Sequence, residues 1–432
     1  MKISGWGRYP VIDSDIVHYH SDDSLFKSID KHEPIIAHGF GRSYGDSALS
    51  ESILKMRPAK RMLQFDKVSG QLTCEAGVLL SEILKTFLPR GWFLEVSPGT
   101  KFVTVGGAIA SDVHGKNHHQ TGAFSESVSE FSLMLPNGSV KTCSRSENKE
   151  LFYATCGGMG LTGIILKATI KLQQVQSSTI SQQVIKTASL RETFQAFEKF
   201  SDEPYSVAWM DCTAAGDSLG RGLLNVGNFN DDGNFNYKPS GTLEVPIAFP
   251  SLLINNASIK LFNQFYYNKN FKKVSNSKVS VDSFFYPLDK LKNWNRLYGQ
   301  KGPLQYQFVL PKKNSFDGIN EILTYLQRNN VYSPLGVLKL FGKQNKNLLS
   351  FPMEGYTLAL DFKVDDKILS LLNDLDKKIT EWGGRIYLAK DSRMNEEVFD
   401  SGYPKADKFR SIREHYGMNE LFNSLQSKRL NL

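Results

Sequence analysis

Residues 103–119 contain a run of small side chains that ends in a cluster of titratable ones. Glycines and other small residues occupy most of positions 106–111, and a backbone without bulky side chains can approach a ligand closely. Residues 114–119 then read His-Gly-Lys-Asn-His-His, so three of the eight histidines of the chain fall in six positions. This segment predicts a surface for a large flat ligand and, where that surface ends, the start of a reactive site.

The chain has three glycine-rich segments, at 39–45, 99–107 and 157–163, and the second of them contains the start of the small-residue run. The loop 39–47 follows a strand-like run and offers N–H groups of the kind that wrap a phosphate, although a structural turn explains it equally well. Residues 158–163 match G-x-G-x-x-G, but 164–172 alternate like a strand, whereas a nicotinamide dinucleotide site needs a helix there. Together the three segments predict one extended ligand of flavin dinucleotide size rather than a nicotinamide cofactor.

Composition limits the classes of partner. The chain has 432 residues, 41% hydrophobic and 22% charged, which predicts a soluble globular protein of two or three domains. A net charge of +8 favours anionic partners, but without a block of like charges nucleic acid is not expected.

The cysteines and the N-terminal sequence indicate the compartment. Cys74, Cys143, Cys156 and Cys212 have no metal-ligand spacing, so we expect no metal site, no disulfide framework and a reducing environment. The sequence has neither a secretory signal pattern nor a stretch of roughly 18 apolar residues that could span a membrane. Cytoplasmic residence is therefore the expectation.

Hydrophobic periodicity predicts two α+β units. In the first, strands at 34–37 and 71–77 precede a helix at 80–88. After a polar stretch at 173–183, the second unit has helices at 190–200, 318–327 and 368–382, and strands at 305–310, 336–341 and 356–362.

The segment 247–273 is harder to assign. It interleaves aromatic residues with lysines, a combination that suits a membrane interface. An ordinary core helix with a solvated lysine side produces the same pattern, and we favour that interpretation because pattern alone seldom separates the two.

Four segments together resemble a known family. They are 39–47, 97–119, 305–308 and 387–393, and with Gly-Trp-Gly-Arg at 5–8 and Lys-Arg-Leu at 428–430 the likeness spans the chain. The sequence resembles the flavin oxidases of the vanillyl-alcohol oxidase type and, within them, the decaprenylphosphoryl-ribose 2′-oxidases. The resemblance implies a two-domain α+β flavoprotein, with an FAD-binding domain at 1–176, a substrate domain with an antiparallel sheet at 177–384, and a return to the FAD-binding domain at 385–432.

The resemblance also implies how FAD is held. Relatives with covalent flavin carry a histidine near the positions of Arg42 or Ser43, and because only His38 lies close by, non-covalent FAD is expected. The implied FAD-binding residues are Ala37, His38, Gly39, Phe40, Gly41, Arg42, Ser43, Tyr44, Gly45, Asp46, Ser47, Gly99, Thr104, Val105, Gly106, Gly107, Ser111, Asp112, Val113, His114, Ile164 and Tyr387.

The reactive groups follow from the same resemblance. Lys390, Tyr44 and His114 are the implied catalytic residues, with Lys390 as base or polariser and His114 as an acceptor or relay of a proton near neutral pH. Without the family likeness, Lys390 reads as a surface lysine beside Asp391. The implied substrate contacts are Lys116, Gln305, Gln307, Lys339, Ala359 and Lys390.

Some of these contacts have a simpler explanation. Gln305 and Gln307 alternate on one strand face, which is either a sugar-binding or merely a polar face, while Lys339 and Lys116 are phosphate contacts or surface charges. Mycobacterial relatives carry a reactive cysteine where Ala359 stands, so covalent trapping by electrophilic inhibitors should be lost.

The implied reaction is oxidation of the 2′-hydroxyl of a polyprenylphosphoryl ribose, or a closely related lipid-linked sugar, to a keto sugar. A separate NAD(P)H-dependent short-chain reductase would complete a C2 epimerisation to the arabinose form for cell-wall or polysaccharide synthesis. A peripheral contact with the inner membrane surface would suit this substrate. The alternatives are a soluble FAD-dependent sugar-lactone or alditol oxidase and a flavoprotein fold kept as a binding module.

Overall fold

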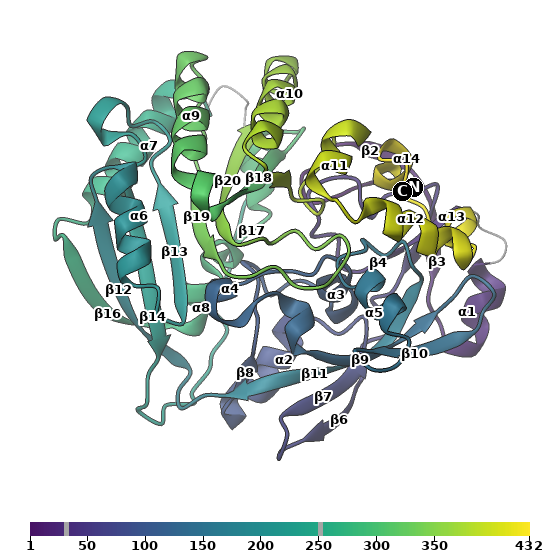
Figure 1. Ribbon diagram of the computed structural model, residues 1–432. Helices are drawn as coiled ribbons and strands as arrows, with labels where there is room; N and C mark the ends of the chain where they lie inside the picture. The colour runs from purple at the N-terminus through teal and green to yellow at the C-terminus, as the bar shows by residue number, and fades with distance from the viewer. Residues whose placement is uncertain (30–33, 249–253) are drawn as a thin grey trace.

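A computed structural model describes residues 1–29, 34–248 and 254–432, and its N-terminal part contains two sheets that carry the predicted glycine loops (Figure 1). Strand β4 (Ile35–His38) lies in a parallel sheet with β3 (Asp15–His18) and β5 (Ser52–Lys55). The second sheet is antiparallel and consists of β10 (Val140–Ser144), β9 (Val128–Met134), β11 (Ile164–Gln174), β7 (Gln71–Glu75) and β6 (Met62–Asp66), with β8 (Trp92–Leu94) paired to β11. The strand that follows the G-x-G-x-x-G match is β11, which confirms that no Rossmann helix follows those glycines.

An antiparallel eight-stranded sheet dominates the middle of the described chain. Its order is β16 (Val274–Ser280), β12 (Thr179–Thr187), β14 (Gly222–Phe229), β13 (Tyr205–Met210), β19 (Gly336–Phe341), β20 (Gly355–Lys363), β18 (Pro303–Pro311) and β21 (Arg385–Ile386). The three predicted strands β18, β19 and β20 are neighbours here, and their register decides which side chains meet in the candidate site. Two short pairs, β1 (Lys2–Ser4) with β2 (Val11–Asp13) and β15 (Leu243–Glu244) with β17 (Leu291–Lys292), lie outside the large sheets.

The predicted amphipathic helices cover the sheets. Helix α2 (Leu80–Phe87) buries Leu80, Ile83, Leu84 and Phe87, the spacing of one helix face. Helices α6 (Leu190–Lys199), α9 (Ser315–Arg328) and α10 (Asp366–Glu381) form a layer on one face of the eight-stranded sheet (Figure 1). Gly383, with φ of +72°, follows α10 in a conformation that favours glycine and ends the helix. Shorter helices are α1 (Asp22–Ile29), α3 (Val105–Ala110), α4 (His118–Thr121), α5 (Lys149–Thr155) and α8 (Val281–Phe285).

The last part of the chain returns to the glycine loops. Helices α11 (Glu396–Gly402), α12 (Ala406–His415), α13 (Met418–Leu421) and α14 (Leu425–Arg429) follow β21, and α12 packs against α5 (Figure 1). Arg429 donates to Asp46 (2.8 Å) in the first glycine loop and to Asp391 (2.9 Å). The C-terminal segment thus braces the loop and the strand end that carry two parts of the candidate site.

The segment 247–273 forms a helix, α7 (Asn256–Asn268), but its favoured interpretation as an ordinary core helix is wrong. Only a narrow stripe of α7 is buried, at Ile259, Asn263 and Tyr267, whereas Phe265 is 70% exposed. The residues of this segment at 249–253 lie outside the described part of the structure. Among the described residues, no helix combines the length and apolar character that a membrane span requires.

Candidate active site

A cavity of about 530 Å³ lies where the glycine loops face the eight-stranded sheet. Its walls come from the first glycine loop, from the segment before and within α3, from strands β18, β19 and β20, and from residues 387–390. A cavity of this size with a few convergent polar groups is typical of a cofactor or substrate site. All three glycine-rich segments contribute to its walls, as the sequence predicted for a single extended ligand.

Most of the residues assigned from sequence line this cavity. They are Ala37, His38, Gly39, Phe40, Gly41, Arg42, Ser43, Tyr44, Ser47, Gly99, Thr104, Gly106, Gly107, Ser111, Val113, His114, Gln305, Gln307, Lys339, Ala359, Tyr387 and Lys390. The cavity wall therefore joins residues that are separated by up to about four-fifths of the chain, from Ala37 to Lys390.

Five residues of the expected cofactor set are not among those that line the cavity: Gly45, Asp46, Val105, Asp112 and Ile164. Gly45 packs so closely on the Asp391 carbonyl that a Cβ would lie 1.6 Å from its oxygen. Val105 and Ile164 belong to the hydrophobic core. In place of Ile164, its neighbour Ile165 lines the cavity, because successive residues of β11 point to opposite faces.

Asp46 and Asp112 support the walls from behind. Asp46 is buried against Arg429, and Asp112 accepts hydrogen bonds from the side chains of Asn345, Asn347 and Ser350 at 2.6–2.7 Å. These bonds fix the loop that leads to His114, so Asp112 shapes the site without reaching the cavity.

Lys116 is likewise not brought to the cavity. Its ammonium group donates to the backbone carbonyls of Phe284 and Phe285, next to the rings of the same two residues. Burial lowers the pKa of Lys116 to about 7. The side chain therefore anchors the end of α8 and is not a solvated surface charge.

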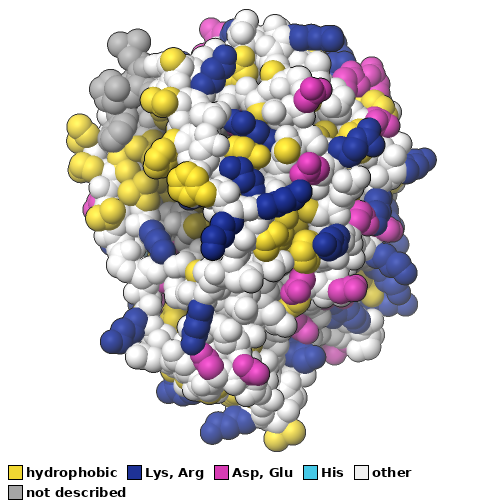
Figure 2. All heavy atoms as spheres, turned by 90° about the vertical axis from the view of Figure 1, so that its left-hand side faces the viewer, with side chains coloured by type: hydrophobic (Ala, Val, Ile, Leu, Met, Phe, Trp, Pro, Cys, Tyr) yellow, Lys and Arg dark blue, Asp and Glu magenta, His cyan; other side chains and the backbone are white. Residues whose placement is uncertain are grey.

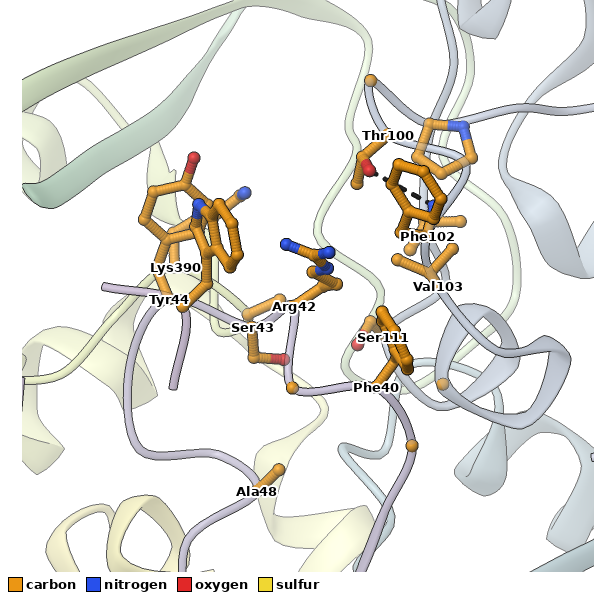
Figure 3. A pocket seen from close by; sticks show the side chains of 18 of the residues that line it. Phe40, Arg42, Ser43, Tyr44, Ala48, Thr100, Phe102, Val103, Ser111 and Lys390 are labelled. Atoms are coloured by element: carbon orange, nitrogen blue, oxygen red, sulfur yellow. Dashed lines mark hydrogen bonds between the residues drawn. The ribbon is translucent and has the colours of Figure 1, made fainter. Parts of the chain in front are cut away.

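The first glycine loop presents a cation, Arg42, with a hydrogen-bond donor that is unpaired within the described part of the chain. The Arg42 guanidinium lies 4.0 Å from the ring centre of Trp6, and its buried Nε has no hydrogen-bond partner among the described residues. Figure 3 shows Arg42 reaching between the side of the cavity with Tyr44 and Lys390 and the side with Thr100 and Phe102. A buried donor of this kind matches an anionic group such as the pyrophosphate of FAD.

The glycines beside Arg42 leave space for the same ligand. Gly41 has φ of +64°, which favours glycine, and a Cβ on Gly99 would meet no atom within 4 Å, so a ligand can approach the backbone there. Thr104 accepts a hydrogen bond from the Gly107 amide (3.1 Å) and holds the small-residue turn in place. The residues present therefore fit FAD.

Cross-strand register places the polar groups of the sheet together. Gln305 pairs with Asp361, Gln307 with Ala359, and Lys339 with Thr357, so side chains two residues apart share one face. Gln305 donates to Asp361 (2.7 Å), and Gln307 donates both to Thr357 (3.2 Å) and to His114 Nε2 (3.1 Å). These bonds hold both amides of β18 in fixed orientations at the cavity wall.

His114 is buried at the cavity wall and is a weaker base than an ordinary histidine. Burial, then the charges of Lys339, His118 and Lys390, lower its pKa well below the usual value, so the ring is neutral. Because Nε2 accepts from Gln307, the proton of the neutral ring is on Nδ1, which has no partner among the described residues. His114 thus offers one hydrogen-bond donor rather than an exchangeable charge.

Lys390 lines the cavity with its ammonium 3.8 Å from the ring centre of Tyr44. Burial lowers the pKa of Lys390 to about 7, Asp361 opposes this shift and Lys339 adds to it. Burial alone lowers the pKa of Lys339 to about 8. Lys390 is therefore not a surface lysine paired with Asp391, whose carboxylate is engaged by Arg429.

Asp361 is a site residue that the sequence analysis missed. It is fully buried, and burial raises its pKa to about 6 despite the hydrogen bond from Gln305 and the charge of Lys390. Its position two residues after Ala359 on the same strand was the available signal, since period-two alternation puts both on one face. Asp361 does not line the cavity but supports Gln305, which does; Trp6 and Trp294, which line the cavity as well, gave no such signal.

Comparison with known proteins identifies the family. A family model for the FAD binding domain matches residues 25–144. Decaprenylphosphoryl-beta-D-ribose oxidase of Mycolicibacterium smegmatis is 34% identical over 451 aligned residues, which cover 100% of this chain and 97% of the relative. An uncharacterised protein of Streptomyces coelicolor is 28% identical over 82% of the chain and 100% of its own length.

A more distant relative covers only one region. L-gulonolactone oxidase of Mus musculus is 35% identical, but over 31% of this chain and 30% of the relative. The full-length match, in contrast, includes the strands of the eight-stranded sheet and Lys390 as well as the FAD-binding loops. The chain therefore belongs to the decaprenylphosphoryl-beta-D-ribose oxidase family and is an FAD-dependent oxidoreductase of the vanillyl-alcohol oxidase fold.

Proposed function

We propose that this enzyme oxidises the 2′-hydroxyl of a polyprenylphosphoryl ribose, or a closely related lipid-linked sugar, to a ketone. The observation that carries the proposal is the position of Lys390, a lysine with a pKa near 7 at the junction of the glycine loops and the polar sheet face. Bound FAD supplies the acceptor for the hydride that leaves the sugar carbon. The protein must then orient the sugar and remove the hydroxyl proton.

Proton removal is the role we assign to Lys390. Near neutral pH a substantial fraction of Lys390 is unprotonated, so Nζ can accept the hydroxyl proton as the C–H bond breaks and the carbonyl forms. The resulting ammonium group is stabilised by Asp361 and by the face of the Tyr44 ring. Tyr44 itself remains protonated, because burial raises its pKa well above the usual value.

The polar sheet face supports the orientation of the sugar. Gln305 and Gln307 are fixed by Asp361, Thr357 and His114, so their remaining polar atoms can bind sugar hydroxyls without loss of side-chain freedom. Lys339, with a pKa near 8, can pair with a phosphate oxygen of the substrate. Ala359, opposite Gln307, leaves room beside these groups.

For the cofactor, we propose non-covalent FAD held by the cavity-lining residues of the first glycine loop, with Arg42 at the pyrophosphate. His38 lies 3.3 Å from Lys55 Nζ, and burial together with that charge lowers its pKa to about 4. We assign residues 1–176 and 385–432 to the FAD-binding domain and 177–384 to the substrate domain. The short strand β21 joins the sheet of the substrate domain just beyond that boundary.

The keto sugar that this enzyme forms is the substrate for a reduction by a second enzyme. A keto sugar becomes the epimeric alcohol when hydride is returned to the opposite face, so we propose a separate NAD(P)H-dependent short-chain reductase as the functional partner and the arabinose form as the final product. Since the substrate carries a polyprenyl chain, we further propose that this enzyme works in the cytoplasm at the surface of the inner membrane.

The experiment that tests the proposal is anaerobic bleaching of the FAD absorbance. A short-chain prenylphosphoryl ribofuranose should bleach it, whereas xylitol and a free aldonolactone should not. Bleaching by the polyol or the lactone, and not by the prenyl phosphate, would instead identify a soluble sugar oxidase.

A further inference from the structure

Helix α7 has two apolar faces, and only one of them is covered. Ile259, Asn263 and Tyr267 recur every four residues and are buried against the large sheet. At about 100° of rotation per residue, Leu261 and Phe265 lie on the side of the helix opposite the buried stripe, and Phe262 lies on the flank next to them. Their exposed fractions are 74%, 51% and 70%.

The exposed apolar surface continues beyond the helix. Phe271, three residues after α7, is 92% exposed, and Val274 at the start of β16 is 44% exposed. Figure 2 shows hydrophobic side chains gathered on this side of the molecule with Lys and Arg side chains between them. We call Leu261, Phe262, Phe265, Phe271 and Val274 the α7 surface.

The charged residues of the segment that carries the α7 surface have one sign. The sequence from 245 to 281 contains five lysines and neither Asp nor Glu. Lys278 pairs with Asp232, but Lys260, Lys269, Lys272 and Lys273 have no ion-pair partner within the described ranges. Lys269 lies 3.5 Å from the ring centre of Tyr266, so its charge is held next to the apolar side chains.

The α7 surface adjoins the candidate active site. Leu335 lines the cavity and packs in the same cluster as Tyr266 and Tyr267 of α7. At the other end, Ile254 packs against the cluster of Tyr44 and Trp294, both of which line the cavity. The helix therefore packs behind residues that line the cavity, although none of its own residues lines it.

We propose that the α7 surface docks the enzyme on an anionic lipid bilayer. Exposed Leu and Phe side chains enter the boundary between headgroups and acyl chains, while the surrounding lysines pair with lipid phosphates. This inference rests on the proposed function, since it brings the cavity to the place where a polyprenyl phosphate is anchored.

A second copy of the chain is a poorer occupant. In a symmetric dimer the same patch would face itself, so the lysines of one copy would meet those of the other without an acidic residue from this segment. A bilayer that contains acidic lipids supplies the missing opposite charge.

Flotation of the FAD-loaded full chain with vesicles tests the proposal. The protein should bind vesicles of phosphatidylcholine mixed with phosphatidylglycerol, and bind pure phosphatidylcholine at least about tenfold more weakly. The double variants Phe262→Ser/Phe265→Ser and Lys272→Glu/Lys273→Glu should each lose about tenfold or more in vesicle affinity. The matched control Val68→Ser/Val140→Ser replaces exposed apolar residues of the FAD-binding part and should bind as the unmodified chain does.

A kinetic comparison separates this inference from the proposed function. FAD reduction by a soluble short-chain substrate should be equal in the unmodified chain and both double variants, whereas reduction by a long-chain substrate in vesicles should slow only in the variants. Equal vesicle binding by all forms, or self-association that disappears in Phe262→Ser/Phe265→Ser, would overturn the docking assignment. If no prenyl phosphate reduces FAD but the vesicle-binding differences persist, the proposed function fails and bilayer docking stands.

Discussion

The cavity wall and the α7 surface depart from the usual distribution of side chains in opposite directions. Lys390 at the wall and Asp361 behind it are ionisable groups removed from water, and burial shifts the pKa values of both toward neutrality. At the α7 surface, Phe265 and Leu261 are large apolar groups left in water. Each departure has a free-energy cost for the isolated protein. A different partner offsets each cost: a reacting sugar at the cavity wall and a lipid surface at α7.

The contrast shows how much each region depends on its surroundings. The Gln305–Asp361 and Gln307–His114 hydrogen bonds connect β18 with β20 and with the loop that carries His114, so a change there is transmitted to several groups. Leu261, Phe262 and Phe265 stand on one side of a helix that is held by its other side, so they can be replaced with little effect on the fold.

Loss of the lysine should have the largest effect. Lys390→Ala removes the proton acceptor, and we expect FAD to remain bound while its reduction by substrate slows about 10²–10⁴-fold. Stopped-flow absorbance under anaerobic conditions measures the rate. Lys67→Ala, at an exposed turn, is the matched control and should behave as the unmodified enzyme does. Reduction of Lys390→Ala at the native rate would refute the assigned role.

Substitutions on the two faces of α7 should differ in their effect on the stability of the protein. Ile259→Ala opens a cavity in the buried stripe and should cost about 2 kcal/mol or more of unfolding free energy. Phe265→Ala on the exposed side should change stability by less than about 0.5 kcal/mol. Thermal melts of the two variants compare them directly, and equal destabilisation would mean that the α7 surface is packed in solution.

Removal of one amide tests the hydrogen-bond network at the wall. Gln307→Leu leaves Nε2 of His114 without its donor and removes a proposed sugar contact, so FAD reduction should slow about tenfold to 100-fold. Gln71→Leu, an exposed glutamine on β7, is the control for the chemical change. An unchanged rate in Gln307→Leu would show that the amide is only part of a polar strand face.

The smallest effect concerns pH. Because the unprotonated amine of Lys390 accepts the proton, the rate of FAD reduction should rise as pH increases through about 7. Asp361 raises the pKa of Lys390, so Asp361→Asn should move this inflection to lower pH by up to about one unit. Stopped-flow pH profiles of the two forms provide the test, and a rate that falls with rising pH would indicate that the ammonium form acts instead.

The sequence predicted local features better than contacts between distant segments. Alternation placed Gln305 and Gln307 on one face of β18, and the glycine segments predicted a shared ligand site. Strand register is set by the partner strands, so the approach of Asp361 to Gln305 could not be read from either strand alone. Ile165 lines the cavity in place of the expected Ile164 for the same reason, since a shift of one residue along a strand moves the side chain to the other face of the sheet.

Charged residues were the least predictable. Lys116 and Lys390 look alike in sequence, yet one is bound by backbone carbonyls and the other lines the cavity. The favoured interpretation of 247–273 as a core helix also failed, because Phe262 and Phe265, which together with the lysines suited a membrane interface, are exposed. In both cases the burial of the side chain depends on which distant parts of the chain pack against it, and a local sequence pattern does not contain this information.

The brace formed by Arg429 also constrains the order of folding during synthesis. The loop 39–47 leaves the ribosome early, but the arginine that pairs with Asp46 is 383 residues downstream. Asp391, which shares that arginine, follows directly after Lys390. The FAD-binding loop and the segment of the reactive lysine therefore gain this shared arginine only after residue 429 has been made, which is also after the whole substrate domain has been synthesised.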